Sequence, residues 1–297
     1  MRRLVFFILF LIFFCPIGIA NSPELEIRIN IPEFILRVYQ SEEIIYEAPV
    51  GVGRPGHETP IGEFIIINKI KDPTWYPKNR EPIPPGQTNP LGSYWLGLSK
   101  KGYGIHGNIN STSIGSSVSL GCIRMYNNDI ELIYHLVEKG TRVKIYYQTI
   151  FLIKEGEDLK FRLLEDIYGY GTNNIFTFLN LIKDKEIKDK IFIPYLIYLL
   201  KTKEAGIYPV PHKVSFIYQN YFYKNIGFRF GNVIYIDPRA IPKLMQKEKE
   251  LKIFLKNKER YITLDELESK LINHRIISHN KELIQIYSKN DFKVRGE

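Results

Sequence analysis

The sequence predicts a mainly β domain with one packed helix, followed by an α+β accessory domain. Apolar and polar residues alternate with a period of two from Leu25 to Ile31, which is typical of a strand with one buried face. A single helical pattern interrupts the strands, between Asn128 and Gly140. Strand-like and helix-like stretches are mixed from about Thr149 to Glu297, which favours an α+β arrangement there.

Length and charge limit the classes of protein. A chain of 297 residues is long enough for two domains. The net charge of +9 is spread, with lysines interleaved among glutamates, and it favours a solvated surface over contact with an anionic envelope polymer. Because no Lys/Arg cluster is interleaved with aromatic residues, we expect no nucleic-acid partner.

Residues 1–20 have the features of a signal peptide. Two arginines precede an apolar run from Leu4 to Ile19, and Gly18-Ile19-Ala20 fits a small-x-small cleavage site. The run is short for a transmembrane helix, so a removed signal peptide is the first interpretation and an uncleaved membrane anchor the second. A lipoprotein site at Cys15 is rejected because two phenylalanines precede it. We therefore expect an exported protein of the periplasm or cell envelope.

The first three strands of the first domain are expected to form an antiparallel meander, and a fourth follows after a loop. The alternation predicts strands at Leu25–Ile31, Phe34–Tyr39, Ile44–Val50 and Phe64–Asn68. His57 lies in a Gly/Pro-rich loop between the last two and is expected on the polar surface. The proline-rich stretch Lys71–Gly92 is long for a connector. Two interpretations stay open for it: a lid over an active-site groove, or a surface excursion with Trp75 packed back on the sheet.

A hairpin, a helix and a closing strand complete this domain. Strands Tyr94–Leu98 and Tyr103–Ile105 are expected to place His106 at a strand end. Asn128 is the predicted helix cap with Glu131 as its reciprocal partner. The buried stripe is predicted at Ile130, Ile133, Tyr134 and Val137, with His135 exposed. Gly140 ends the helix, and Thr141–Tyr147 is the closing strand.

The stretch from His106 to Arg124 carries the candidate chemistry. Cys122 is the sole cysteine after residue 15, so in an exported chain it has no internal disulfide partner. It is a dimer bridge, a packed core residue or a nucleophile. Gly121 permits a sharp turn at the thiol, and the positive charge of Arg124 favours thiolate. A nucleophile, the base His106 and backbone N–H donors are together in this stretch, and the residues alone leave the catalytic and the structural interpretation both open.

Further motifs precede this stretch. They are Pro49–Arg54, Thr59–Phe64, Pro73–Pro77, Pro84–Gly86 and Asn89–Gly92. In this order, and with His106-Gly107 and Ser119-Leu120-Gly121-Cys122-Ile123-Arg124, the chain resembles the L,D-transpeptidase (YkuD-type) catalytic domain family. The Pro-Thr-Trp and Pro-Pro-Gly blocks resemble its Gram-negative periplasmic branch in particular. Leu120 departs from the histidine that many members carry there.

The resemblance implies a β-sandwich-like catalytic domain over residues 24–147 and acyl transfer on peptidoglycan stem peptides. Cys122 would attack the carbonyl of the third stem residue and release the terminal D-alanine. The acceptor would be another stem peptide, a lysine of an envelope protein, or water, which would make a carboxypeptidase. A non-catalytic wall-binding protein is the rival from another class. Sortase-like transpeptidation and a redox role for Cys122 are the more distant ones.

The resemblance also implies a role for each site residue. His106 is the general base and acid, with its second ring nitrogen held by a backbone carbonyl such as that of Gly107. The N–H groups of Gly121 and Cys122 are the expected oxyanion donors. The expected substrate-binding residues are Arg124, Ser119, Trp75 and Tyr94; the alternatives are that Ser119 braces His106 and that Arg124 holds the loop. No metal or organic cofactor is needed.

Residues 150–297 match no family and are interpreted as an accessory domain that binds the wall or a partner, or as a packing extension of the first domain. Strands are expected at Val214–Tyr218 and Val233–Ile236, and helices at Phe176–Lys185, Tyr195–Lys201 and Leu244–Asn257. Two imperfect strand–helix copies hint at a weak repeat over residues 230–272. His212, His274 and His279 lack metal-ligand spacing, so no metal site is assigned.

Overall fold

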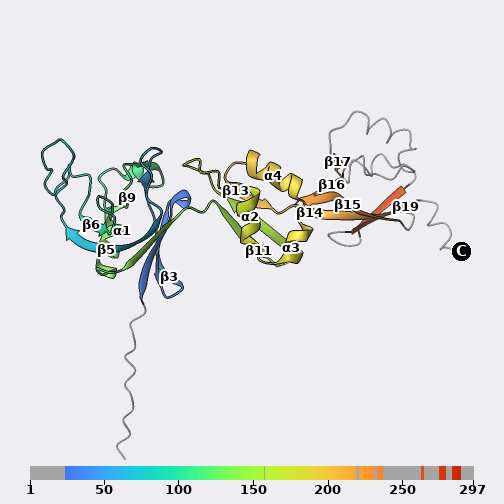
Figure 1. The fold of residues 1–297 in the computed structure, drawn as a ribbon, viewed down its shortest axis with the longest axis horizontal. Helices are drawn as coiled ribbons and strands as arrows, with labels where there is room; N and C mark the ends of the chain where they lie inside the picture. Colours follow the sequence, from blue (N-terminus) through green and yellow to red (C-terminus); the bar gives the residue numbers. More distant parts are fainter. Residues whose placement is uncertain are drawn as a thin grey trace, which may run out of the picture.

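A computed structural model describes residues 24–156, 158–218, 221–230, 233–236, 262–263, 274–278 and 283–288. Three units follow one another along the long axis of the molecule (Figure 1). We call residues 24–147 the first unit, 150–210 the second and 212–288 the third. The predicted signal peptide, the helix at Leu244–Asn257 and most of the possible repeat at 230–272 lie outside the described residues.

The first unit is an eight-stranded sheet, and the meander predicted for its first three strands is present. Its order is β3 (Glu43–Pro49), β2 (Ile35–Gln40), β1 (Leu25–Asn30), β10 (Arg142–Tyr146), β5 (Gly62–Lys71), β6 (Tyr94–Leu98), β7 (Gly104–His106) and β9 (Ile123–Arg124). The pairs β1–β10 and β7–β9 are parallel and the other neighbours are antiparallel. A short parallel ribbon of β4 (Val52–Gly53) and β8 (Ser117–Ser119) lies apart from this sheet. The mainly β fold with few helices is confirmed.

One helix, α1 (Asn127–Leu136), packs against β6 and β7. Ile130, Ile133 and Val137 are fully buried in the core that helix and sheet share. The predicted cap is wrong: the helix begins one residue before Asn128, and its N-cap residue, Tyr126, makes no side-chain cap. The neighbouring Asn127 side chain is used elsewhere, because its Oδ1 accepts the Asn108 N–H at 3.1 Å. The helix start is thus tied to the loop after His106.

The second unit packs three helices with a three-stranded sheet. The strands are β11 (Ile150–Glu155), β12 (Asp158–Leu163) and β13 (Gly206–Pro209), and the helices are α2 (Ile175–Leu181), α3 (Lys185–Lys190) and α4 (Ile193–Thr202). Phe161 and Phe178 meet edge to face at 5.3 Å in its core. Helices occur where two were predicted, but the first ends at Leu181 because Asp184 caps a separate short helix, α3. None of the described helices is long and apolar enough to cross a membrane.

The third unit is described as a six-stranded sheet. Its order is β17 (Ile262–Thr263), β16 (Val233–Ile236), β15 (Tyr221–Phe230), β14 (His212–Tyr218), β19 (Leu283–Ser288) and β18 (His274–Ser278). The two strands predicted here, Val214–Tyr218 and Val233–Ile236, are both present. Strands with three helices after the first unit fit the expected α+β class.

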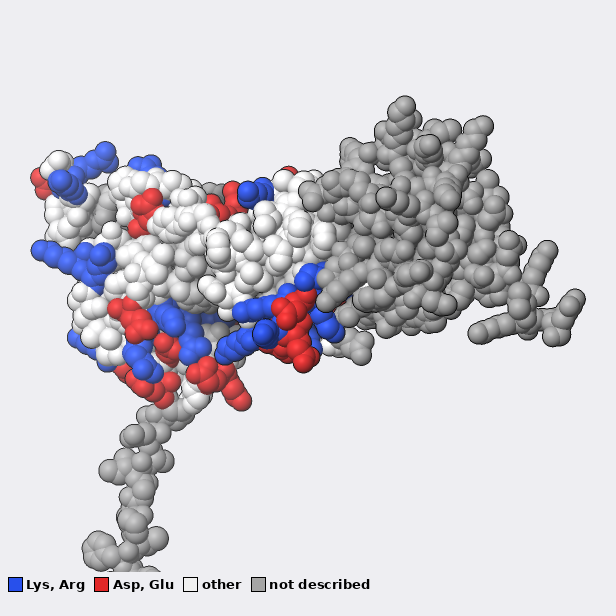
Figure 2. All heavy atoms as spheres, turned by 45° about the vertical axis from the view of Figure 1, so that its right-hand side comes forward, with Lys and Arg blue, Asp and Glu red and all other residues white. Residues whose placement is uncertain are grey.

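Charged side chains pair across the described surface. Figure 2 shows basic and acidic side chains lying next to one another, as the interleaved sequence predicts. Glu33, whose side chain is only 4% exposed, accepts Arg37 at 2.8 Å and Arg162 at 3.0 Å. Since Arg162 belongs to β12, this pair ties the second unit to the first.

Candidate active site

Two adjacent strands bring the candidate residues together. In the parallel pair β7–β9, Ile105 is opposite Ile123 and His106 is opposite Arg124. Residues opposite each other in a sheet point to the same face, so the imidazole and the guanidinium share one face. Cys122 lies two residues before Arg124, and the charge of Arg124 acts on both the Cys122 thiol and the His106 ring. The predicted trio therefore gathers at one sheet edge.

The tautomer of His106 follows from its neighbour. The ring is buried, with 4% of the residue exposed, and its Nδ1 lies 2.6 Å from the carbonyl oxygen of Gly107. The Gly107 carbonyl only accepts, so in the neutral ring the proton is on Nδ1 and Nε2 is unprotonated, and a second backbone hydrogen bond of the ring is at Leu91. This confirms the predicted contact with the Gly107 carbonyl. Burial lowers the pKa of His106 to about 4, with a smaller contribution from Arg124, so the ring is neutral at pH 7.

An indole lies against the imidazole. Trp95, opposite His106 in the antiparallel pair β6–β7, stacks on the ring with centroids 5.7 Å apart and planes at 21°. Its Nε1 donates to Asn68 Oδ1 at 3.1 Å. Gly97 and Gly104 leave room for the indole, because a Cβ at either glycine would collide with it. The sequence motifs did not single out Trp95, although its register opposite His106 in the predicted hairpin pointed to it.

The neighbouring Tyr94 points to the other face of β6. Its ring lies 4.7 Å from that of Tyr134 on α1, and its hydroxyl donates to Glu131 Oε1 at 2.8 Å. Only 4% of Tyr94 is exposed. The predicted role of Tyr94 in substrate binding is therefore wrong, because successive strand residues alternate between faces and Tyr94 takes the helix side.

The thiol of Cys122 is half-buried. Its Sγ lies 3.6 Å from the carbonyl oxygen of Gly102, in the turn that leads into β7. Burial raises the pKa of Cys122, and a backbone hydrogen bond at Gly104 and the charge of Arg124 oppose that rise. At pH 7 the Cys122 thiol and the His106 imidazole are consequently both neutral.

The backbone before the thiol turns sharply. Gly121 has φ +109°, and a Cβ there would lie 2.7 Å from the Tyr103 ring, so both conformation and space require glycine. Ser119 Oγ accepts the Gly121 N–H at 3.0 Å and donates to the Cys122 carbonyl at 2.6 Å. Ser119 is 2% exposed, so these two bonds hold the loop from within.

These bonds correct two predictions. The Gly121 N–H already donates a hydrogen bond to Ser119 Oγ, so it is not available as a donor to an oxyanion. The Ser119 hydroxyl is bonded within the loop that carries the thiol, so it neither braces His106 nor faces substrate. Of the two predicted oxyanion donors, the Cys122 N–H is the one that these two bonds do not engage.

Arg124 is half-buried beside the thiol. Its Nε is a buried atom without a hydrogen-bond partner among the described residues. Burial lowers the pKa of Arg124 while the Cys122 thiol opposes that shift. A buried cation with an unused donor stabilises negative charge at the thiol, which is what a thiolate or an oxyanion would present.

The loop from Asp72 to Ser93 is held by hydrogen bonds among its own residues. The amide of Asn89 is buried and donates to three carbonyls of the loop, those of Pro73, Ile83 and Pro84, at 2.8–3.2 Å. Trp75 pairs with Ile83 through backbone hydrogen bonds of 2.9 and 2.8 Å. No described hydrogen bond or ring contact of Trp75 reaches Cys122 or His106, so its role at substrate stays a prediction, as does the lid.

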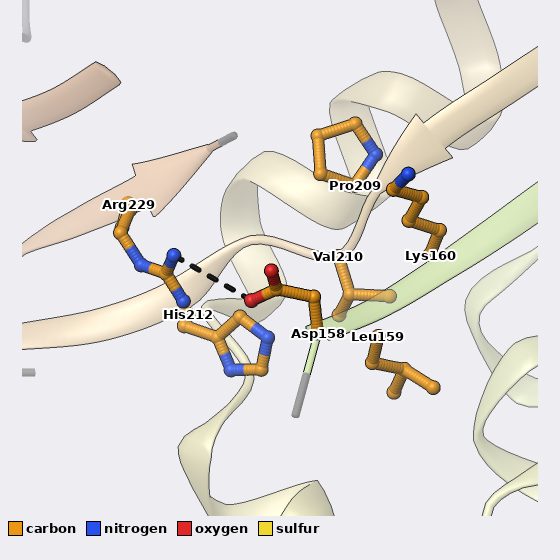
Figure 3. A pocket seen from close by; sticks show the side chains of 7 residues that line it. All are labelled: Asp158, Leu159, Lys160, Pro209, Val210, His212 and Arg229. Carbon is orange, nitrogen blue, oxygen red and sulfur yellow. Dashed lines mark ion pairs between the residues drawn. The ribbon is translucent and has the colours of Figure 1, made fainter. Parts of the chain in front are cut away.

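A separate pocket lies far along the chain from this site. It has a volume of about 330 Å³ and is lined by residues of β12, β13, β14 and β15 and by Val210 before β14 (Figure 3). Arg229 and Asp158 form an ion pair across it at 3.8 Å, next to His212. Lys160 also lines the pocket, and its ammonium pairs with Glu155 at 2.6 Å.

Comparison with known proteins agrees with the first unit. The model of the L,D-transpeptidase catalytic domain, YkuD, matches residues 24–145. The putative L,D-transpeptidase YkuD of Bacillus licheniformis is 42% identical over 130 residues, which cover 43% of this chain and 70% of that protein. The chain belongs to the L,D-transpeptidase family.

Other relatives of this family member match the same part of the chain. The putative L,D-transpeptidase YqjB of Bacillus subtilis is 41% identical over 135 residues, 44% of this chain and 70% of YqjB. The probable L,D-transpeptidase ErfK/SrfK of Escherichia coli is 34% identical over 139 residues, 42% of this chain and 44% of that protein. A crystal structure of an Enterococcus faecium L,D-transpeptidase has 25% identity and a TM-score of 0.37, covering 41% of this chain and 50% of that one. All these matches cover less than half of this chain.

Proposed function

We propose that this L,D-transpeptidase family member transfers acyl groups between peptidoglycan stem peptides through Cys122. The observation that carries the proposal is the β7–β9 pairing, which aligns His106 with Arg124 on one face next to Cys122. Three components of nucleophilic acyl transfer support it: a thiol, a neutral imidazole with an unprotonated Nε2, and a backbone donor at Cys122.

In the acylation step, Sγ of Cys122 attacks the carbonyl carbon of the third stem residue at its L-centre. His106 Nε2 takes the thiol proton during the attack, because neither group is charged at rest. The carbonyl oxygen becomes an oxyanion, which accepts a hydrogen bond from the Cys122 N–H. Collapse breaks the C–N bond to D-alanine, whose amine leaves with the proton from the imidazolium, and a thioester remains.

In the second step, an amine attacks the thioester carbonyl and gives its proton to His106. The thiolate leaves and is reprotonated by the imidazolium, which restores the neutral pair. Arg124 stabilises the charge that develops at sulfur and oxygen in both steps. The acceptor is the amine of another stem peptide, a lysine of an envelope protein, or water. We also propose export to the periplasm or cell envelope, on the basis of the N-terminal sequence.

The test is intact-protein mass spectrometry of the purified chain incubated with a disaccharide-tetrapeptide, with and without a carbapenem. A covalent adduct on the wild type and none on Cys122→Ala, with release of D-alanine, would support acyl transfer through Cys122. A cross-linked product identifies a transpeptidase, and a tripeptide product alone identifies the carboxypeptidase. A folded wild type that forms neither adduct nor product would overturn the proposal.

A further inference from the structure

The peptide bond between Gly121 and Cys122 is held from outside the loop that contains them. The Thr59 hydroxyl donates to the Gly121 carbonyl at 3.0 Å. In a planar trans peptide, the C=O and the following N–H point in opposite directions. Because Thr59 fixes where the Gly121 carbonyl points, it also fixes the direction of the Cys122 N–H, the proposed oxyanion donor.

Thr59 closes a tight turn with Gly53, the turn of residues 53–59. Its Oγ1 accepts the Gly53 N–H at 2.8 Å, and only 1% of Thr59 is exposed. A Cβ on Gly53 would collide with the His57 carbonyl, so the backbone of the turn is close-packed at that point. Gly53 also pairs with Ser119 in the β4–β8 ribbon. The turn therefore contacts the loop that carries Cys122 at two places, at Ser119 through Gly53 and at Gly121 through Thr59.

Tyr168 joins the two ends of that turn. Its hydroxyl donates to the Gly53 carbonyl at 2.7 Å and accepts the Thr59 N–H at 3.2 Å. One phenol oxygen thus satisfies an acceptor and a donor at opposite ends of the turn. Tyr168 lies beyond Ile145, the last residue that the family model matches, so this contact comes from outside the matched domain.

Tyr168 is itself held in a preformed segment, the strap of residues 166–172. Tyr147 OH donates to Asp166 Oδ1 at 2.6 Å and accepts the Tyr168 N–H at 2.9 Å. The Asp166 carboxylate also accepts the N–H groups of Tyr170, Gly171 and Thr172 at 2.6–3.2 Å. The rings of Tyr147 and Tyr168 stack with centroids 5.5 Å apart. The strap therefore presents the phenol to the turn with little freedom.

We propose that Tyr168 is a positioning residue for acyl transfer, acting through Thr59 and the Gly121 carbonyl on the direction of the Cys122 N–H. This inference rests on the proposed function. If the inference holds, the residues needed for acyl transfer extend past the matched domain to the strap. The reason is that Tyr168, a side chain of the strap, closes the turn of residues 53–59, and this turn orients the Cys122 N–H.

The test compares two reactions of Cys122 in the full chain. Acylation by a carbapenem passes through an oxyanion, whereas alkylation by iodoacetamide displaces iodide and forms none. The variants are Tyr168→Phe, with Tyr170→Phe as the matched control from the same strap. Thr59→Val removes the hydroxyl that reaches Gly121, and Thr59→Ser keeps it. Thermal unfolding of each variant establishes that it is folded.

We expect Tyr168→Phe and Thr59→Val to slow acylation about tenfold, less than the loss of a whole oxyanion donor, with alkylation unchanged. Tyr170→Phe and Thr59→Ser should acylate like the wild type. Equal slowing of both reactions, or wild-type acylation by Tyr168→Phe, would overturn the inference while the proposed function stands. If Tyr168→Phe does not fold, the Thr59 pair decides by the same criterion. A wild type without any adduct would overturn both proposals.

Discussion

Burial of His106 makes the stability of the first unit depend on pH. The pKa of this ring is lowered from 6.5 to about 4, chiefly by burial. Above pH 6.5 the ring is neutral in both the folded and the unfolded chain, so it adds no pH dependence. Between pH 6.5 and 4 the unfolded chain binds a proton that the folded chain does not, so the free energy of unfolding falls as the pH falls. With these pKa values the loss reaches about 3 kcal/mol at about pH 4.

The assay is denaturant unfolding followed by tryptophan fluorescence at about pH 7, 5.5 and 4, for the wild type and His106→Gln. Both tryptophans, Trp75 and Trp95, lie in the first unit, so the signal reports that unit. The difference between the free energies of unfolding of the wild type and the variant, taken at each pH, isolates the contribution of His106 from those of the other titrating groups. The reasoning would be refuted if the two proteins lost the same free energy between the highest and the lowest pH.

Three further predictions concern the thiol and the loop. Gly121→Ala should reduce carbapenem acylation at least about tenfold, whereas Gly115→Ala, also at positive φ but in open space, should stay within about twofold, as measured by mass spectrometry. Arg124→Gln should raise the pKa of the neighbouring thiol and slow its alkylation by iodoacetamide about threefold at neutral pH; an unchanged pH dependence of alkylation would contradict the electrostatic role. Asn89→Ala should lower the free energy of unfolding by about 2 kcal/mol and expose the loop to protease, unlike the exposed Gln87→Ala.

The sequence predicts the strands of the first unit well because each has one buried face. In β1, Ile27 and Ile29 are fully buried, while Glu26 and Arg28 pair with each other at 2.6 Å on the other face. The same periodicity does not reveal which residues meet across the sheet. Trp95 contacts His106 only because of the β6–β7 register. Tyr94 could be assigned only after the two faces of β6 were distinguished.

The bonds around the thiol were beyond the reach of sequence pattern for a different reason. Ser119 and Gly121 lie in the predicted motif, but which N–H groups are engaged depends on side-chain and backbone torsions that spacing does not specify. The contact between Thr59 and Tyr168 joins residues 109 positions apart, and no local preference encodes such a contact. Family resemblance did not help there, since the strap lies beyond the matched residues.

The neutral resting state of the site affects how its thiol oxidises. A thiolate is the form that oxidants attack, so a raised pKa at Cys122 slows oxidation, which would protect the thiol under the proposed export. The same burial lowers the pKa of His106, so the base does not deprotonate the thiol in advance. In the proposed reaction, proton transfer is therefore coupled to attack on a bound carbonyl, at the moment when the Cys122 N–H and the charge of Arg124 can stabilise the product. Under that proposal the orientation of the N–H is decisive, because activation takes place in the transition state and not before it.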